Sequence, residues 1–199
     1  MFGNAWFNME TGETVAIDRC QQGDVSAFGE LYDTYIKKIY DFVYYKTLHR
    51  ETAEDLTSVV FTKALEHINS FTNTEGSFSA WLYRIARNTV IDHYRTRKIE
   101  KDVDDVWDLS SSEDVAHDTD VRLKLEKAEK LLGVLTSEQR DIVIMRLWQD
   151  MTHADIATVI GKSEGAVKVA YSRAITKLRG EMSALLILLM LFQIIKTKG

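Results

Sequence analysis

The sequence predicts an all-α protein made of two small helical domains, and three observations support this prediction. The 199 residues include no proline and only 10 glycines, which permits long helices and argues against a turn-rich β protein. Along several stretches apolar residues recur at steps of three and four, the spacing of one helix face. An acidic segment without this period separates these stretches. We therefore place domains at residues 1–98 and 123–182, an acidic linker at 99–122 and an apolar tail at 183–199.

The first domain is predicted to contain one short helix and three long ones. The short helix covers Thr14–Gln22. The long helices run from Asp24 to about Lys46, from Thr52 to about Ile68, and from Ser77 to about Lys98. Because none of the long helices can bury its apolar stripe alone, we expect the three to pack together as a bundle.

The linker follows from the uneven distribution of charge. Residues 99–120 hold nine acidic side chains and one lysine, although the formal net charge of the whole chain is only −5. The rest of the chain is therefore net positive. Dense like charge and a run of three serines predict a flexible, self-repelling linker. A solvated tether without a partner is an equally good interpretation.

The second domain carries the sharpest local pattern. An apolar stripe ends at Leu135, and a new helix is predicted from Thr136 because Gln139 follows in capping-box spacing. Within 152–179, a short helix, the turn Gly161-Lys162-Ser163 and a longer helix have helix-turn-helix spacing. We expect this element to bind DNA. An ordinary helical hairpin with a basic face is the alternative.

A second polar pattern lies on the 77–98 helix, opposite its apolar stripe. The residues recur at steps of four, four and three: Arg84, Asn88, Asp92 and Arg95. Arginine side chains attract phosphate, and asparagine or aspartate among them can contact base edges. A solvated helix face would produce the same pattern.

Three segments together resemble a known family. "SFSAWLYRIARNTVIDHYRTRK" (77–98) resembles the −10-reading helix of extracytoplasmic-function (ECF) sigma factors of the sigma-70 family. Residues 24–71 resemble the rest of their region 2, and residues 135–182 resemble their region 4. The match covers most of the chain in the family's order. It implies a subunit that binds core RNA polymerase and directs it to promoter DNA, in response to stress or envelope signals.

The resemblance also assigns roles to individual residues. It places the −10 face on the four residues of the polar pattern. A loop that captures a flipped −10 base would consist of Asn73, Thr74, Glu75, Gly76 and Ser77. Contact with polymerase would involve Asp55, Leu56, Val60 and Phe61. The −35 element would be read by Ser163, Glu164, Gly165, Lys168 and Arg173.

The sequence departs from the family at two places. Ser58-Val59 stands where the family often has Gln-Glu, and Val169-Ala170 stands where it usually has Ser-Arg. The first puts the polar part of the polymerase contact in question. The second removes an arginine from the −35 helix.

No catalytic, metal or cofactor site is expected. The five histidines have no paired ligand spacing, and no phosphate loop or nucleophile motif is present. The single cysteine, Cys20, and an N-terminus without signal-peptide character indicate a cytoplasmic protein. A helix-turn-helix regulator that acts without polymerase and a membrane-tethered interaction protein are the competing functions.

The tail is the feature that the resemblance does not explain. Met182–Ile195 is apolar except for Ser183 and Gln193, and it is shorter than the ~20 residues of a bilayer span. It could pack on the second domain, bind a hydrophobic partner or associate with a membrane. The sequence also leaves open whether an anti-sigma factor is a partner.

Overall fold

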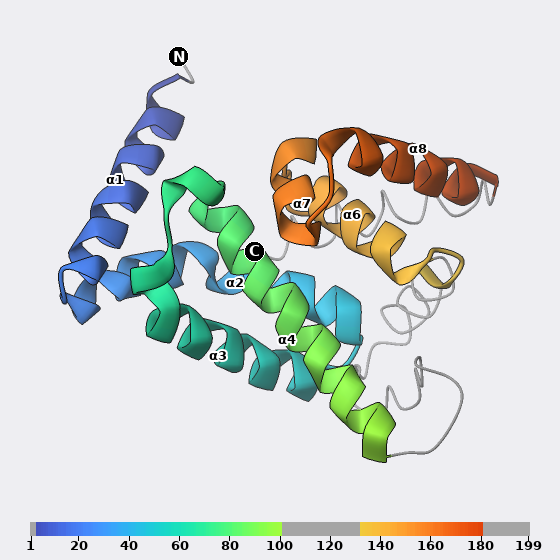
Figure 1. Ribbon diagram of the computed structural model, residues 1–199, viewed down its shortest axis with the longest axis horizontal. Helices are drawn as coiled ribbons and strands as arrows, with labels where there is room; N and C mark the ends of the chain where they lie inside the picture. The colour runs from blue at the N-terminus through green and yellow to red at the C-terminus, as the bar shows by residue number, and fades with distance from the viewer. Residues whose placement is uncertain (1–2, 101–131, 181–199) are drawn as a thin grey trace, which may run out of the picture.

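The computed structural model describes residues 3–100 and 132–180, and every regular element in these ranges is helical (Figure 1). The elements are α1 (Gly3–Gln21), η1 (Val25–Ala27), α2 (Phe28–Thr47), α3 (Arg50–His67), η2 (Ile68–Ser70), η3 (Asn73–Glu75), α4 (Phe78–Glu100), α6 (Ser137–Leu147), α7 (His153–Ile160) and α8 (Glu164–Gly180). The all-α prediction is confirmed. The predicted linker and tail lie outside the described residues.

Helices α1 to α4 form the N-terminal bundle. Its core is built from the stripes that the sequence predicted: Ile39 and Phe42 of α2, Val60 of α3 and Leu82 of α4 are all fully buried. The ring of Phe42 meets that of Tyr83 edge to face at 5.3 Å between centroids. Since α2, α3 and α4 each contact the other two, every long helix buries its stripe against neighbours.

The beginning of the bundle differs from the prediction. Helix α1 begins at Gly3 rather than Thr14. Asp24 does not lie inside a helix but caps η1, because its carboxylate accepts a hydrogen bond from the Ser26 amide at 3.1 Å. Aspartate favours such positions because its short side chain competes with helical backbone bonds. The result is a turn that lets α1 fold back against α2.

Helices α6, α7 and α8 form the C-terminal unit. Both helix starts are capping boxes: Thr136 with Gln139, as predicted, opens α6, and Thr152 with Asp155 opens α7. Gly161 ends α7 in the left-handed conformation at φ 69°, a geometry that suits glycine. These local signals set where α6 and α7 begin and where α7 ends.

The two units pack against each other. Helix α7 lies against α4, and α6 contacts α2 (Figure 1). One cluster of buried apolar residues continues from the N-terminal bundle into the C-terminal unit, where it includes Ile142, Met145 and Ile156. The prediction of two domains joined by a flexible segment did not include this contact. Among the described helices, none is long and apolar enough to span a bilayer.

Candidate nucleic-acid interface

The predicted −10 face occupies one side of α4. Asn88 and Arg95 are exposed, whereas Arg84 and Asp92 are partly buried. Arg95 Nη2 lies 3.1 Å from Asp92 Oδ1, in an exposed ion pair of a kind worth about 1 kcal/mol or less. Such a pair is easily exchanged for a contact with a phosphate. The face therefore offers an amide for base edges and guanidinium groups for the backbone.

The predicted base-capture loop lies between the bundle core and the start of α4. Asn73 and Thr74 are exposed in η3, and Gly76 has φ 120°, a conformation that L side chains rarely adopt. Ser77 Oγ accepts a hydrogen bond from the Ala80 amide at 3.2 Å and so caps α4. The side chain of Glu75 is not described. Gly76 and Ser77 both face the C-terminal unit, since their nearest partners are on α7.

The helix-turn-helix is formed by α7 and α8. Ala157 is buried, and Val167 of α8 is fully buried in the same apolar cluster, so the two helices approach closely. The Lys162 amide donates to the Ala157 carbonyl at 3.0 Å across the turn. Ser163 Oγ accepts from the Ala166 amide at 3.3 Å and caps α8. The sequence-based prediction of this motif is confirmed in its geometry.

The outer side of α8 is open along its first turns. All five predicted −35 residues are exposed: Ser163, Glu164, Gly165, Lys168 and Arg173. Glu164 and Lys168 form an ion pair at 2.6 Å, and the hydrogen bond from Lys168 lowers the pKa of the Glu164 carboxyl. Gly165, beside them, has no side chain that would project from this surface. This surface can enter a groove of duplex DNA without any rearrangement of its own helix.

The predicted polymerase contacts divide into two groups. Asp55 is exposed on α3. Leu56, Val60 and Phe61 are buried at 8%, 0% and 5% exposure, because they form the side of α3 that packs on α2 and α4. Leu56 and Val60 hold α3 in place, and the ring of Phe61 also lines a groove between α2 and α3. Val59, beside them, is 40% exposed.

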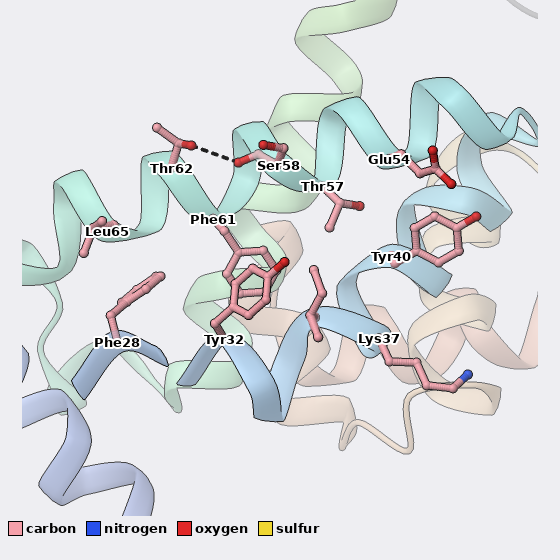
Figure 2. Close-up of a pocket in the computed structure, with 11 residues that line it drawn as sticks. Phe28, Tyr32, Lys37, Tyr40, Glu54, Thr57, Ser58, Phe61, Thr62 and Leu65 are labelled. Carbon is pink, nitrogen blue, oxygen red and sulfur yellow. Dashed lines mark hydrogen bonds between the residues drawn. The ribbon is translucent and has the colours of Figure 1, made fainter. Parts of the chain in front are cut away.

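A groove of about 610 Å³ runs between α2 and α3, next to the exposed residues of α3 (Figure 2). Tyr32 and Phe61 meet edge to face across it with centroids 4.8 Å apart. Lys37 of α2 and Glu54 of α3 lie at the same end of the groove, and Phe28 and Leu65 lie at the other end (Figure 2). An apolar floor beside exposed α3 residues is the composition expected where a partner helix binds.

The sequence did not identify three charged residues that join the two units. Asp141 of α6 is fully buried and bonds to Lys46 of α2, and Arg87 Nε of α4 donates to its Oδ2 at 2.9 Å. Burial lowers the pKa of Lys46, and the Asp141 carboxylate acts in the opposite direction. In the sequence, Lys46 and Asp141 stand next to apolar core positions. Charged residues on a solvated helix face stand next to such positions too, so the sequence pattern does not reveal that these two are buried. We call these three residues the interdomain ion cluster.

Protein-family models match both units. The model for Sigma-70 region 2 matches residues 31–99, and the model for Sigma-70, region 4 matches residues 125–178. Together the two matches cover more than half of the chain. They fall on α2 to α4 and on the helix-turn-helix unit respectively.

Curated relatives point the same way. The ECF RNA polymerase sigma factor BldN of Streptomyces coelicolor is 38% identical over 166 residues, which is 81% of this chain and 62% of BldN. The ECF RNA polymerase sigma factor SigW of Bacillus subtilis is 28% identical over 178 residues, 83% of this chain and 94% of SigW. The chain thus spans less than two thirds of BldN but nearly all of SigW.

Two solved structures share the fold. CnrH, in complex with the cytosolic domain of CnrY, has a TM-score of 0.69 and 22% identity, covering 87% of this chain and 98% of that one. RpoE of Bartonella quintana, in complex with the anti-sigma factor NepR, has a TM-score of 0.60 and 23% identity, covering 78% and 96%. With both family regions matched in order on helical units of the expected kind, this chain belongs to the ECF group of the sigma-70 family of RNA polymerase sigma factors.

Proposed function

We propose that this sigma factor binds core RNA polymerase and directs it to promoters by reading a −10 element with α4 and its preceding loop and a −35 element with α8. One observation carries the proposal. Two exposed polar surfaces lie on two units, and each unit matches a different sigma-70 region. A protein that bound DNA through the helix-turn-helix alone would not need the polar surface of α4.

The −10 role rests on the exposed groups of α4. Asn88 can form paired hydrogen bonds with an adenine edge, and such contacts discriminate between bases. Arg84 and Arg95 supply positive charge on the same side, which positions the strand through its phosphates. Melted DNA would leave one base to enter the loop formed by Asn73–Ser77.

The −35 role rests on the first turns of α8. Lys168 and Glu164 lie one helical turn apart and can address neighbouring base edges, while Arg173 stands further along for phosphate. Val169 and Ala170 follow Lys168 in place of the family's Ser-Arg. We therefore infer a −35 contact that depends mainly on Lys168 and Arg173.

The polymerase contact is proposed for the outer side of α3. Asp55, Ser58 and Val59 are exposed there, and the groove between α2 and α3 adjoins them. Val59 adds apolar area where the family often has a glutamate. The solved structures of CnrH and RpoE are complexes with CnrY and NepR, and we propose that an anti-sigma factor likewise regulates this protein in the cytoplasm.

A transcription assay with purified components tests the proposal. The full chain is mixed with core polymerase, the complex is isolated by affinity capture, and initiation is measured on a library of randomised promoters. We expect stable capture and initiation from a subset of promoters that share two elements. If the chain binds duplex DNA tightly without polymerase and supports no initiation, the protein is a polymerase-independent regulator and the proposal is wrong.

A further inference from the structure

Helix α8 exposes a large apolar side chain on the side that is proposed to read the −35 element. Val169 is 50% exposed, whereas every other large apolar side chain in the described part of α8 is buried or partly buried. The inner side of this helix is formed by Val167, Ala174 and Leu178, which are all fully buried. Val169 therefore adds nothing to the core, and its methyl groups remain available to a partner.

The neighbours of Val169 leave these methyl groups accessible. A helical side chain points toward the turn before it, so Val169 is directed toward the turn that contains Gly165. A Cβ atom on Gly165 would meet nothing within 4 Å, so the space beside it is open. Lys168 pairs with Glu164 at 2.6 Å, and its ammonium group thus points toward Glu164 and not toward Val169. A base edge can reach Val169 without displacing either charged side chain.

The chemistry of valine suits one group in the major groove of DNA. The C5-methyl of thymine is the apolar group that base pairs present there. Branching at Cβ holds a helical valine in one preferred rotamer, so its methyl groups are already ordered and little side-chain entropy is lost on contact. The charged groups of Glu164 and Lys168 can address polar atoms of other base edges, but they do not attract a methyl group.

We infer that Val169 is a specificity-determining residue that contacts the C5-methyl group of a thymine in the −35 element. The inference rests on the proposed role of α8 in reading that element. The contact selects thymine over cytosine, which has no methyl group at this position. Removing the methyl from the base should weaken binding about fourfold. Val169→Arg would exchange the methyl contact for a charged one, so it would remove the preference for thymine even where it tightens binding.

Replacing thymine by uracil tests the contact, because it removes the C5-methyl group and leaves the base-pairing groups in place. The full chain is combined with core polymerase, and a promoter is selected from a randomised library by initiation. Each −35 thymine of that promoter, on either strand, is then replaced by deoxyuridine, and the affinity of the complex is measured by competition. We expect one replacement to weaken wild-type binding about fourfold and to leave the affinity of Val169→Ala unchanged.

Val134→Ala is the matched control. Val134 is 43% exposed in the same unit, but it precedes α6 and lies outside the predicted −35 residues. The same truncation there should keep the about fourfold dependence on the thymine methyl group. Both variants should melt at the wild-type Tm, because neither valine is buried. A change in methyl dependence that is confined to Val169→Ala therefore reports the contact and not a loss of folding.

The results that overturn the inference differ from those that overturn the proposed function. The inference is overturned by a selected −35 element without an A·T pair, by uracil replacements that leave wild-type affinity unchanged, or by equal methyl dependence in Val169→Ala and wild type. Each of these results leaves initiation by the wild-type chain intact. If no promoter in the library supports initiation, the proposed function is overturned and the inference falls with it.

Discussion

Two neighbouring valines on α3 separate the core role of this helix from its proposed polymerase contact. Val60 is fully buried, and Val59 is 40% exposed, although only one peptide bond separates them. We compare Val60→Ala with Val59→Ala in the full chain. The substitution is chemically the same, so the difference between the two variants reports the environment of each side chain.

The burial of each residue sets the expected magnitude. Val60→Ala removes two buried methyl-sized groups at about 0.8 kcal/mol each and leaves a small cavity, for a loss of about 2–3 kcal/mol in unfolding free energy. In a chain of this size that lowers Tm by roughly 5–10 °C. Val59→Ala should change the stability by no more than about 0.5 kcal/mol. It should weaken polymerase binding by about 1 kcal/mol, or roughly fivefold, because less apolar area is covered in the complex.

Thermal melting gives the stability of each variant, and titration of labelled chain with core polymerase gives its affinity. The affinity is measured well below Tm, so that every variant is folded. The reasoning is refuted if Val60→Ala keeps the wild-type Tm but binds polymerase more weakly. That result would mean that the side of α3 assigned here to the core faces the partner.

Three further predictions concern the DNA-reading surfaces and the N-terminal cap. Asn88→Ala should relax the base preference at one −10 position by about 1–3 kcal/mol, whereas Arg95→Ala should weaken binding to all promoters alike and reduce its salt dependence. Initiation from a randomised promoter library distinguishes the two variants, and equal losses on all promoters from Asn88→Ala would count against base reading. Val169 is half-exposed, so Val169→Arg should tighten binding to −35 duplex by about 1 kcal/mol. Ala170 packs against the core, so Ala170→Arg should instead lower Tm. Equal affinity and equal Tm for the two variants would contradict the placement of Val169 outside and Ala170 inside. The Ser26 hydrogen bond and then Arg19 lower the pKa of Asp24 from 3.8, so its stabilising contribution is present above that value and is lost as the pH falls through the lower folded pKa. Asp24→Asn should therefore flatten the decline of Tm on acidification, and an unchanged acid profile would show that the cap does not stabilise the turn.

The local architecture could be predicted from the sequence because it depends on short-range physics. Apolar spacing located α2, α3 and α4, since a helix repeats every 3.6 residues whatever it packs against. The caps at Thr136 and Thr152 and the glycine at 161 act within one turn of chain, so their residue types suffice to predict them. The polar face of α4 followed from the same periodicity, as the positions opposite its stripe, whereas the resemblance to ECF sigma factors assigned the −10 and −35 roles.

Periodicity does not tell which neighbour covers a face. The resemblance assigned Val60 and Phe61 to the polymerase contact, which stays a prediction. In the structure Val60 is fully buried on the side of α3 that faces its own bundle, and Phe61 is buried but lines the groove between α2 and α3. Val59 was noted only as a departure from the family, yet its side chain is 40% exposed on α3.

The sequence by itself determined that the chain is helical, that α4 carries a polar face opposite its apolar stripe and that α7 and α8 form a helix-turn-helix. Only the tertiary structure decided that Asp141 meets Lys46 and Arg87 and that Ser77, at the start of α4, bonds to Asp155 of α7. The physical reason is distance along the chain. Lys46 and Asp141 are separated by 95 positions, and no local propensity or period relates two side chains that far apart. Their contact exists because two apolar surfaces meet, and the charges are buried as a consequence of that packing.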